Sequence, residues 1–489
     1  MKLVLGVDSS TQSVKVDARS LETGELIATG RASHPPTTPP VSEQDPVSWW
    51  NALVGAISQI GDARNDVVAI SVAGQQHGLV LLDENDDPLR PAKLWNDTTS
   101  APNADQLVAS LGPQWWAERT GSVPVAAFTI TKLAWVAEHE PELLDRISKV
   151  MLPHDYLTYR LSGAHVTDRG DASGSGWFDA LGDKTLSEAL DAATGTSDWN
   201  GRVPTVLGPT DPAGSILPEI AAELGLPAEV VVGPGTGDNM GAALGLGLGE
   251  GDIVISLGTS GTVYARSTKR TTDPSGAVAG FCDATGQFLP LVCTLNATKV
   301  TDTIANLLGV DAPGLAEMAL SAGTEVVEPT LVPYFDGERT PNRPDARGII
   351  VGLTTATNRE EIARAAHDGV LCGLLDGVDA LENAGATLDG RLFLVGGGSK
   401  SAAYRQRLAT IAGRPVFVPT NDETVAVGAA IQAAIVAEPG TSLDERSTAW
   451  NADESEATEP ASDGNGAAIR ERYRDASAFE DGLCRPAVP

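Results

Sequence analysis

The chain has 489 residues, of which 42% are hydrophobic and 20% are charged, as expected for a globular protein with two or more domains. The formal net charge of −31 argues against binding to nucleic acid or to an anionic membrane surface, because both attract basic patches. Apolar runs shorter than the ~18 residues of a membrane span, a short N-terminal apolar run and four cysteines without Cys-x-x-Cys spacing predict a cytoplasmic protein with reduced thiols.

Predicted strands and helices alternate from the N-terminus onward. A β-meander is predicted over residues 2–30, with its first tight turn at Ser9–Gln12. A helix follows Asp45-Pro46, and a buried strand covers Val67–Ala73. Helical patterns dominate residues 101–160. This alternation of strands and helices is typical of α/β architecture.

The second half repeats the alternation. A loop at Gly235 leads into a helix of small residues, and a second strand–turn–strand pattern follows at 252–264. The later predicted elements are a strand at Arg391–Val395, a helix at Ser401–Ala412, a strand at Pro415–Pro419 and a helix at Thr424–Val436. We therefore predict an N-terminal domain over 1–246, a C-terminal domain over 247–440, and an acidic tail over 441–489. The tail is expected to be surface or poorly ordered up to 467, ahead of a last helix near Ala467–Phe479.

The two strand–turn–strand patterns look like copies of one device. In the first, the turn carries Asp8 with Ser9 and Thr11; in the second it is Gly258-Thr259-Ser260. Turns of Gly, Ser and Thr direct backbone N–H groups and hydroxyls at one point, which suits a phosphate. The repetition indicates an internal duplication at the scale of a domain. Two such turns are also typical of a protein that holds a polyphosphate.

Two carboxylates stand where chemistry could occur. Asp8, at the end of a strand beside hydroxyl residues, suits a Mg²⁺ ligand or caps its own turn. Asp238, at the head of a helix, is either a plain helix cap or a general base for a hydroxyl nucleophile. An ionised Asp is a weak base, but phosphoryl transfer asks little of its base beyond positioning and late proton acceptance.

Three further groups follow predicted strands. Gln76 and His77 come after one strand, and Trp95 and Asp97 follow another. Their amide, imidazole and carboxylate groups suit sugar hydroxyls, and the indole suits an apolar sugar face; each is also compatible with a structural role. Gly396-Gly397-Gly398 joins a strand to a helix, where it either makes a tight turn or lets backbone approach an adenosine or phosphate. The dinucleotide pattern Gly-x-Gly-x-x-Gly is missing there, which disfavours a nicotinamide oxidoreductase.

Taken together, the motifs resemble the FGGY carbohydrate kinases, and within that family the xylulokinase group. The resemblance covers about residues 2–435. It rests on the ordered motifs Asp8-Ser9-Ser10-Thr11, Glu43-Gln44-Asp45-Pro46 with Trp49-Trp50, Gln75 to Gly78, Leu94-Trp95-Asn96-Asp97, Gly237-Asp238-Asn239, Leu257 to Gly261 and Gly396-Gly397-Gly398. The resemblance implies two actin-like, ribonuclease-H-like domains around a central cleft. It also implies D-xylulose and ATP as substrates, with Mg²⁺, and it leaves a homodimer as an expectation.

The resemblance also implies residue roles. Asp238 is the expected catalytic base, and Asp8 is the acidic residue of the first phosphate loop, needed for Mg²⁺ and activity. Asn239 joins Asp238, Gln76, His77, Trp95 and Asp97 in binding sugar. The expected nucleotide contacts are Ser9, Thr11, Gly258, Thr259, Ser260, Gly397, Gly398 and Ser401.

The chain departs from the family pattern in three places. Gln76 stands where Met is common, Thr99 where Arg is common, and Ala127 where Gly is usual. These departures bear on sugar preference more than on reaction class. One alternative is a sibling kinase for ribulose, gluconate, glycerol or another sugar or polyol. The other is a non-kinase actin-like ATPase, which would keep both turns without needing the polar groups around His77 and Trp95.

Overall fold

The structure is a computed structural model that describes residues 1–196, 198–322, 328–420, 423–451, 455–462 and 464–483. The chain forms two compact units. Unit 1 contains residues 1–248, 272–289 and 423–453, and unit 2 contains 249–271, 290–422 and 454–489. No helix of the described residues is both long and apolar enough to cross a membrane.

Unit 1 is an α/β fold built on a mixed sheet. The strands of unit 1 are β1 (Leu3–Ser9), β2 (Ser13–Ser20), β3 (Leu26–Ser33), β4 (Glu43–Gln44), β5 (Val67–Gly74), β6 (Val80–Leu82), β7 (Ala92–Lys93), β8 (Lys149–Met151), β9 (Val166–Asp168), β10 (Phe178–Asp179), β11 (Lys184–Thr185), β12 (Thr205–Leu207), β13 (Gly214–Ser215), β14 (Val231–Val232), β15 (Thr236–Gly237) and β18 (Ala279–Cys282). Its helices are α1 (Pro46–Gln59), α2 (Ala101–Leu111), α3 (Pro113–Thr120), α4 (Thr129–His139), α5 (Pro153–Ser162), α6 (Arg169–Ala172), α7 (Ser187–Thr194), α8 (Pro218–Leu224), α9 (Asp238–Gly245), α14 (Thr424–Ala437) and α15 (Leu443–Trp450).

Unit 2 repeats the architecture with fewer elements. Its strands are β16 (Ile253–Leu257), β17 (Gly261–Ala265), β19 (Phe288–Thr294, of which the first two residues belong to unit 1), β20 (Thr330–Val332), β21 (Ile349–Val351), β22 (Leu392–Val395), β23 (Val416–Pro419) and β24 (Ser455–Thr458). Its helices are α10 (Thr298–Leu308), α11 (Ala312–Ser321), α12 (Arg359–Asn383), α13 (Ala402–Ala412) and α16 (Gly466–Leu483).

The two main sheets share one strand pattern, which confirms the predicted α/β class and internal duplication. In unit 1 the order runs β14-β5-β1-β2-β3, and in unit 2 it runs β23-β22-β16-β17-β19. In each sheet, the first strand of the hairpin (β1 or β16) pairs antiparallel with the second (β2 or β17). On its other side it pairs parallel with β5 or β22. The predicted turns of small residues therefore occupy equivalent places in the two units.

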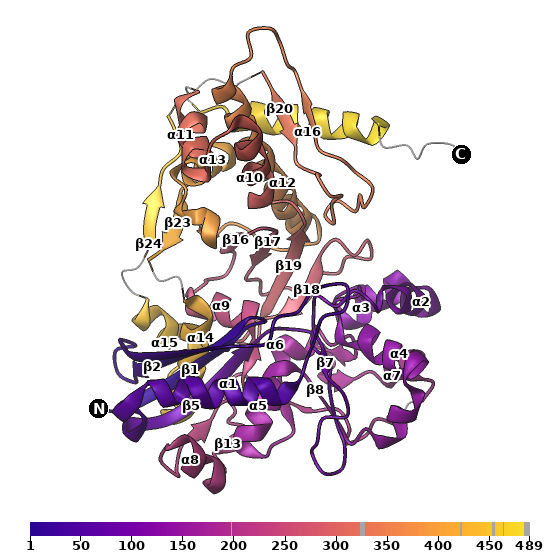
Figure 1. Ribbon diagram of the computed structural model, residues 1–489, viewed down its shortest axis with the longest axis vertical. Coiled ribbons are helices and arrows are strands. Elements are labelled where there is room, and N and C mark those ends of the chain that lie inside the picture. The colour runs from indigo at the N-terminus through magenta and orange to yellow at the C-terminus, as the bar shows by residue number, and fades with distance from the viewer. Residues whose placement is uncertain (197, 323–327, 421–422, 452–454, 463, 484–489) are drawn as a thin grey trace. The chain divides into compact units, whose positions relative to one another are not determined.

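Helix α14 belongs to unit 1, although it follows the whole of unit 2 in sequence. Figure 1 shows this orange helix beside β1 and β5, among the indigo strands of the N-terminus. The contact is close because both surfaces carry small residues: an added Cβ at Gly6 would lie 2.0 Å from the Ala426 carbonyl oxygen. A Cβ at Gly428 would lie 1.9 Å from the Gly241 carbonyl oxygen of α9. Unit 1 thus extends beyond the predicted first domain.

The region expected to be surface or poorly ordered contains more regular structure than its composition suggests. Helix α15 begins with a capping box, in which Ser442 and Glu445 bond each other's backbone N–H groups. Strand β24 pairs antiparallel with β23 at the edge of the sheet in unit 2. The predicted last helix is present as α16, and it contacts β20 and α13. Local capping and edge pairing therefore order segments that are polar in composition.

The cysteines that the structure describes have free thiols, as predicted. They are Cys282, Cys293 and Cys372. Cys484 lies outside the described residues.

Candidate active site

Strands of unit 1 bring Asp8, Gln76 and Asp238 to one edge of the sheet. Strand β5 pairs in parallel with both β1 and β15, so the three strands end side by side. Asp8 lies opposite Ala73 in this register, and the residue before Asp238 lies opposite Gly74. In open α/β sheets this carboxyl edge is where ligands bind. The edge is the candidate active site of unit 1.

Asp8 is a partly buried carboxylate with unmet bonding capacity. Its Oδ1 atom is itself buried and accepts no hydrogen bond from any described residue. Burial raises the pKa of Asp8 to about 7, and the negative charges of Asp238 and Glu423 add to the effect, while Lys15 and Arg31 oppose it. A cation beside Asp8 would relieve this repulsion and satisfy the orphaned oxygen, so the site fits a hard metal ion.

No group of three His, Cys, Asp or Glu side chains in the described part of the chain is arranged to hold a metal ion. In kinase sites Mg²⁺ is commonly bound through one or two carboxylates together with substrate phosphates and water.

Asp238 is the first residue of α9. Its Oδ1 accepts hydrogen bonds from the Asn239 backbone N–H at 2.8 Å and from Asn239 Nδ2 at 3.0 Å. Burial raises the pKa of Asp238 to about 6, and the bonds from Asn239 limit the rise because they stabilise the anion. A carboxylate with this pKa is ionised at pH 7 yet more basic than an exposed Asp, which suits a general base.

Gln76 and His77 follow β5 and face the same region. Gln76 Oε1 accepts from Asn239 Nδ2 at 2.7 Å, whereas Gln76 Nε2 is buried and donates to no described group. His77 has a φ of 65°, rare for a residue with a side chain and a conformation that clusters at functional sites. Its Nδ1 lies 3.1 Å from the Gly174 carbonyl oxygen, so Nδ1 carries the proton and Nε2 is the acceptor when the ring is neutral.

The His77 ring is also held by packing. Its centroid lies 5.0 Å from that of Phe128 and 5.4 Å from that of Phe281. A Cβ on Gly174 would lie 2.3 Å from His77 Cε1, so only glycine fits against this edge of the ring. Sequence reasoning did not single out Gly174 or Phe281, because neither stands in a recognisable motif.

Trp95 is linked to the first turn by a chain of hydrogen bonds. Its indole Nε1 donates to Thr11 Oγ1 at 2.9 Å, and Thr11 donates to Gln75 Oε1 at 3.0 Å. Trp95 remains 47% exposed, which leaves part of its ring face open to a ligand. The structure therefore brings the predicted indole to the predicted phosphate turn.

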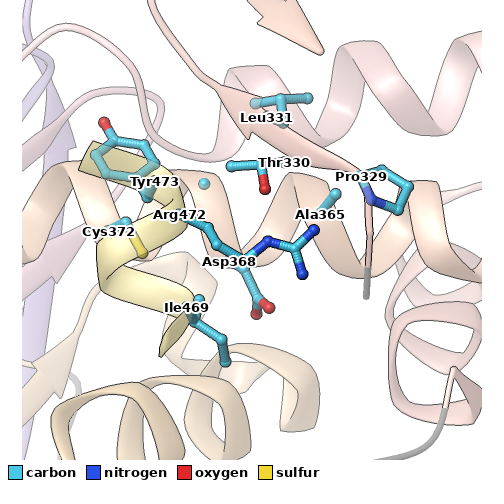
Figure 2. Close-up of a pocket in the computed structure, with 10 residues that line it drawn as sticks. Pro329, Thr330, Leu331, Ala365, Asp368, Cys372, Ile469, Arg472 and Tyr473 are labelled. Carbon is cyan, nitrogen blue, oxygen red and sulfur yellow. The ribbon is translucent and has the colours of Figure 1, made fainter. Parts of the chain in front are cut away.

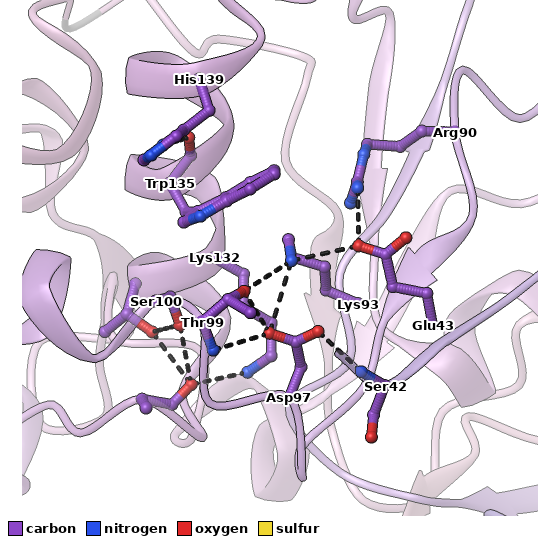
Figure 3. Close-up of polar contacts among 12 residues, drawn as sticks. Ser42, Glu43, Arg90, Lys93, Asp97, Thr99, Ser100, Lys132, Trp135 and His139 are labelled. Atoms are coloured by element: carbon purple, nitrogen blue, oxygen red, sulfur yellow. Dashed lines mark hydrogen bonds and ion pairs between the residues drawn. The ribbon is translucent and has the colours of Figure 1, made fainter. Parts of the chain in front are cut away.

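Asp97 is placed differently from the other predicted sugar ligands. It is fully buried, and its Oδ2 accepts from the Ser42 backbone N–H at 2.9 Å. Its Oδ1 accepts from Thr99 N–H at 3.0 Å and from Lys93 Nζ at 3.4 Å (Figure 3). Although burial opposes ionisation, bonds from Thr99 and Ser42 hold the pKa of Asp97 below its ordinary value. Both carboxylate oxygens already accept hydrogen bonds from protein donors, so we propose a structural role for Asp97 in place of the predicted sugar contact.

A buried charge network around Lys93 and Lys132 was not expected from the sequence. Lys93 Nζ lies 3.1 Å from Glu43 Oε1 and 3.8 Å from the centre of the Trp135 ring. Lys132 is buried beside this cluster, and burial lowers its pKa to about 7 (Figure 3). Both lysines lie in apolar patterns that give no sign of a buried charge network.

In unit 2, the second turn and the glycine turn lie side by side. Strands β16 and β22 are parallel neighbours, with Ser256 opposite Val395. A Cβ on Gly398 would lie 2.4 Å from Leu257 Cδ2, so the glycine turn packs directly on the end of β16. Thr259 and Ser260 are exposed at the tip of the second turn.

Two further predicted nucleotide residues, Gly397 and Ser401, lie at this same edge of unit 2, whereas Ser9 ends β1 and Thr11 lies in the first turn of unit 1. Gly397 is exposed, and a Cβ there would meet no atom within 4 Å. Ser401 precedes α13, and its buried Oγ has no hydrogen-bond partner among the described groups. Open backbone and an unused hydroxyl at a helix N-terminus are the features that suit a phosphate or ribose.

Unit 2 also contains a pocket that none of the predicted residues lines. It lies between α12, β20 and α16, and Figure 2 shows Asp368, Cys372 and Tyr473 around it. Its Asp368 carboxylate is engaged by Arg407. This pocket is therefore separate from the turns that carry the predicted nucleotide contacts.

Comparison with known proteins gives matches along nearly the whole chain. The profile described as the N-terminal domain of the FGGY family of carbohydrate kinases matches residues 3–245, and that of its C-terminal domain matches 253–437. A xylulose kinase of Streptomyces coelicolor is 48% identical over 435 residues, which cover 88% of this chain and 87% of the relative. A xylulose kinase of Escherichia coli is 38% identical, with coverage of 90% and 91%. The crystal structure of xylulose kinase from Bifidobacterium adolescentis superposes with a TM-score of 0.85 at 40% identity, covering 97% and 99% of the two chains.

Proposed function

This chain belongs to the FGGY family of carbohydrate kinases and is an ATP-dependent sugar kinase, and we propose that it converts D-xylulose to D-xylulose 5-phosphate. The names of its relatives support this choice of sugar, since those at 48% and 47% identity are both xylulose kinases. The observation that carries the proposal is the convergence of Asp238, Asn239 and Gln76 at the carboxyl edge of one sheet.

The sugar is proposed to bind in unit 1. Gln76 Nε2 has no hydrogen-bond partner among the residues that the structure describes, so it is an available donor to a sugar oxygen. His77 Nε2 accepts from a hydroxyl, and the exposed part of the Trp95 ring covers an apolar face of the sugar. Asp238 and Asn239 complete the set of polar groups. Buried donors without partners discriminate strongly among ligands, because an ill-fitting sugar leaves them unpaired.

Asp238 is proposed to act as the general base. The sugar O5 forms a bond to the γ-phosphorus as the bond from that phosphorus to the bridging oxygen of ADP breaks. The hydroxyl proton passes to the Asp238 carboxylate, and ADP leaves. Because the transition state of phosphoryl transfer is loose, the base mainly orients the hydroxyl and takes its proton late. Asn239 holds the carboxylate in a fixed orientation while this happens.

Nucleotide contacts are proposed in each unit. In unit 2 we assign phosphate and ribose contacts to Gly258, Thr259 and Ser260, with the backbone of exposed Gly397 and of its buried neighbour Gly398 and the hydroxyl of Ser401. In unit 1 we assign phosphate contacts to Ser9 and Thr11. We further propose that Asp8 holds Mg²⁺, which neutralises negative charge on the phosphates when it is bound. The orphaned Oδ1 of Asp8 supports this assignment.

A sugar panel tests the proposed substrate. Initial rates of ADP release are measured with D-xylulose, D-ribulose, L-ribulose, gluconate and glycerol under identical conditions. We expect the highest kcat/KM with D-xylulose and almost no ADP release without sugar. A higher kcat/KM with another sugar or polyol would identify a sibling kinase. Rapid ADP release that no sugar stimulates would instead indicate an actin-like ATPase.

A further inference from the structure

A buried ionic cluster lies beneath the strand that leads to Asp238. His154 Nε2 lies 3.3 Å from Asp155 Oδ1, 3.3 Å from Asp168 Oδ1 and 3.4 Å from Asp171 Oδ2. All four side chains are buried. The pKa of His154 is raised to about 9: burial opposes its protonation, but the three carboxylates prevail. His154 is thus surrounded by three carboxyl groups, and the proposed chemistry does not use this cluster.

Asp168 connects this cluster to the strand. Its Oδ2 accepts from Thr236 Oγ1 at 3.0 Å and from the Gly170 backbone N–H at 2.8 Å. Its Oδ1 accepts from the Asp171 backbone N–H at 3.0 Å. Thr236 is fully buried in β15 and stands two residues before Asp238. The carboxylate therefore fixes one side of the segment that carries the base.

A second set of bonds fixes the start of the same segment. Gln432, fully buried in α14, donates from Nε2 to the Gly235 carbonyl oxygen at 3.0 Å. Its Oε1 accepts from Ser71 Oγ at 3.0 Å, and Ser71 Oγ accepts from the Gly235 N–H at 3.3 Å. A Cβ on Gly235 would lie 2.6 Å from His154 Nδ1, so this backbone also packs on the His154 ring.

We propose that Thr236 and Gln432 are positioning residues that hold the Gly235–Gly237 segment and so aim Asp238 at the sugar hydroxyl. This inference rests on the proposed role of Asp238 as the base. Gly235 and Gly237 have no side chains with which to anchor the backbone, so the bonds from Asp168, Ser71 and Gln432 provide the anchoring. Catalysis is sensitive to such anchoring, because a displacement of about 1 Å at a reacting group costs on the order of 10²-fold in rate.

The test compares Thr236→Val with Thr236→Ser. Valine keeps the shape of the side chain and removes the hydroxyl, whereas serine keeps the donor to Asp168. We expect Thr236→Val to lower kcat by about 10-fold or more, with the KM values for D-xylulose and ATP changed by less than about 3-fold. Thr236→Ser should keep kcat within about 3-fold of wild type. A kcat of Thr236→Val within 2-fold of wild type, or an equal loss in Thr236→Ser, would overturn the proposal.

Two further variants separate positioning from general loss of stability. Thr120 is a buried threonine of unit 1 whose hydroxyl bonds the Trp116 and Ser122 carbonyl oxygens, so Thr120→Val removes a comparable hydroxyl elsewhere. It should lower Tm without the loss of kcat. Gln432→Met removes the bonds at the Gly235 end and should lower kcat as Thr236→Val does. It provides the same test if Thr236→Val fails to fold, and an unchanged kcat in a folded Gln432→Met protein would contradict the role of Gln432.

A double-mutant cycle distinguishes failure of this inference from failure of the proposed function. If Thr236 acts through Asp238, adding Thr236→Val to an Asp238→Asn protein should lower kcat by less than about 2-fold. A further 10-fold loss in that background would overturn the positioning role and leave the base assignment intact. If Asp238→Asn alone keeps the wild-type kcat, the base assignment itself fails.

Discussion

The side-chain amide of Asn239 donates a 2.7 Å hydrogen bond to Gln76 Oε1, and the same nitrogen lies 3.0 Å from Asp238 Oδ1. One amide thus joins a residue that follows β5 to the carboxylate at the head of α9. It orients the proposed sugar ligand and the proposed base together, and it stabilises the base as an anion.

Asn239→Ala should lower kcat/KM for the sugar by about 10- to 100-fold, the range for losing hydrogen bonds to a charged group. Because the lost bonds favour the ionised carboxylate, the pKa of Asp238 should rise and the acid limb of the pH profile should move upward. The matched control is Asn103→Ala, since Asn103 Nδ2 donates to Glu138 Oε2 at 2.7 Å away from the sheet edge. An Asn239→Ala protein that behaves like the control would refute this role.

The pH dependence of kcat/KM should report Asp238. Since burial raises its pKa to about 6, the base becomes protonated as the pH falls through that value. With saturating ATP and Mg²⁺, kcat/KM for the sugar should fall about 10-fold per unit below pH 6. A profile that is flat between pH 7 and pH 5 would show that Asp238 does not act in its ionised form.

The same pKa shift has the opposite consequence for folding. The folded pKa of Asp238 exceeds its unfolded value of 3.8, so its contribution to stability is complete below pH 3.8. That contribution is lost as the pH rises through about 6. Acid loss of activity between pH 6 and pH 5 therefore cannot come from destabilisation by this group, and circular dichroism at both pH values checks that the protein stays folded.

Asp97 and His77 should separate structural from binding roles. Asp97→Asn replaces one carboxylate oxygen by an NH2 group, which cannot accept a hydrogen bond from the Ser42 or Thr99 backbone N–H. The free energy of unfolding should therefore fall by about 1–3 kcal/mol. The sugar KM should stay within about 2-fold of wild type. His77→Ala should instead raise the sugar KM. The reverse pattern, with the sugar KM raised by Asp97→Asn, would restore Asp97 to the sugar site.

The Arg407–Asp368 ion pair should stabilise unit 2. Arg407 donates from Nε and Nη2 to the two carboxylate oxygens at 2.7 and 2.8 Å, and both residues are buried. Asp368→Asn leaves a buried guanidinium uncompensated and should cost about 3–5 kcal/mol. Asp336→Asn, which breaks an exposed pair with Lys299, should cost at most about 1 kcal/mol. Equal shifts in Tm for the two variants would contradict this account.

Much of the site could be predicted because sequence patterns fix strand ends. The apolar runs before Asp8 and Gln76 mark parallel strands, and their carboxyl ends necessarily meet at one sheet edge. The glycine turn at Gly396–Gly398 was found for the same reason, since it ends β22 beside β16. Local periodicity was enough to place these residues at strand ends, whereas their proposed roles came from the family resemblance.

Other features depend on contacts that local patterns do not encode. Helix α14 is apolar on every side, so its sequence indicates burial but not which sheet buries it. Asp97 follows a predicted strand, as Gln76 does, so the sequence gives no reason to separate the two. Only the folded structure shows that the Ser42 backbone N–H, which is distant in sequence, donates to the Asp97 carboxylate. Gln432 is likewise 197 residues from Gly235, the backbone that it holds.

The turnover of Asp238→Ala tests the central claim most directly. The kcat for D-xylulose is measured under saturating ATP and sugar, on protein shown to be folded by its Tm. If Asp238 accepts the hydroxyl proton, kcat should fall by at least ~10²-fold, within the range of general acid–base contributions. A kcat within about 2-fold of wild type would contradict the account.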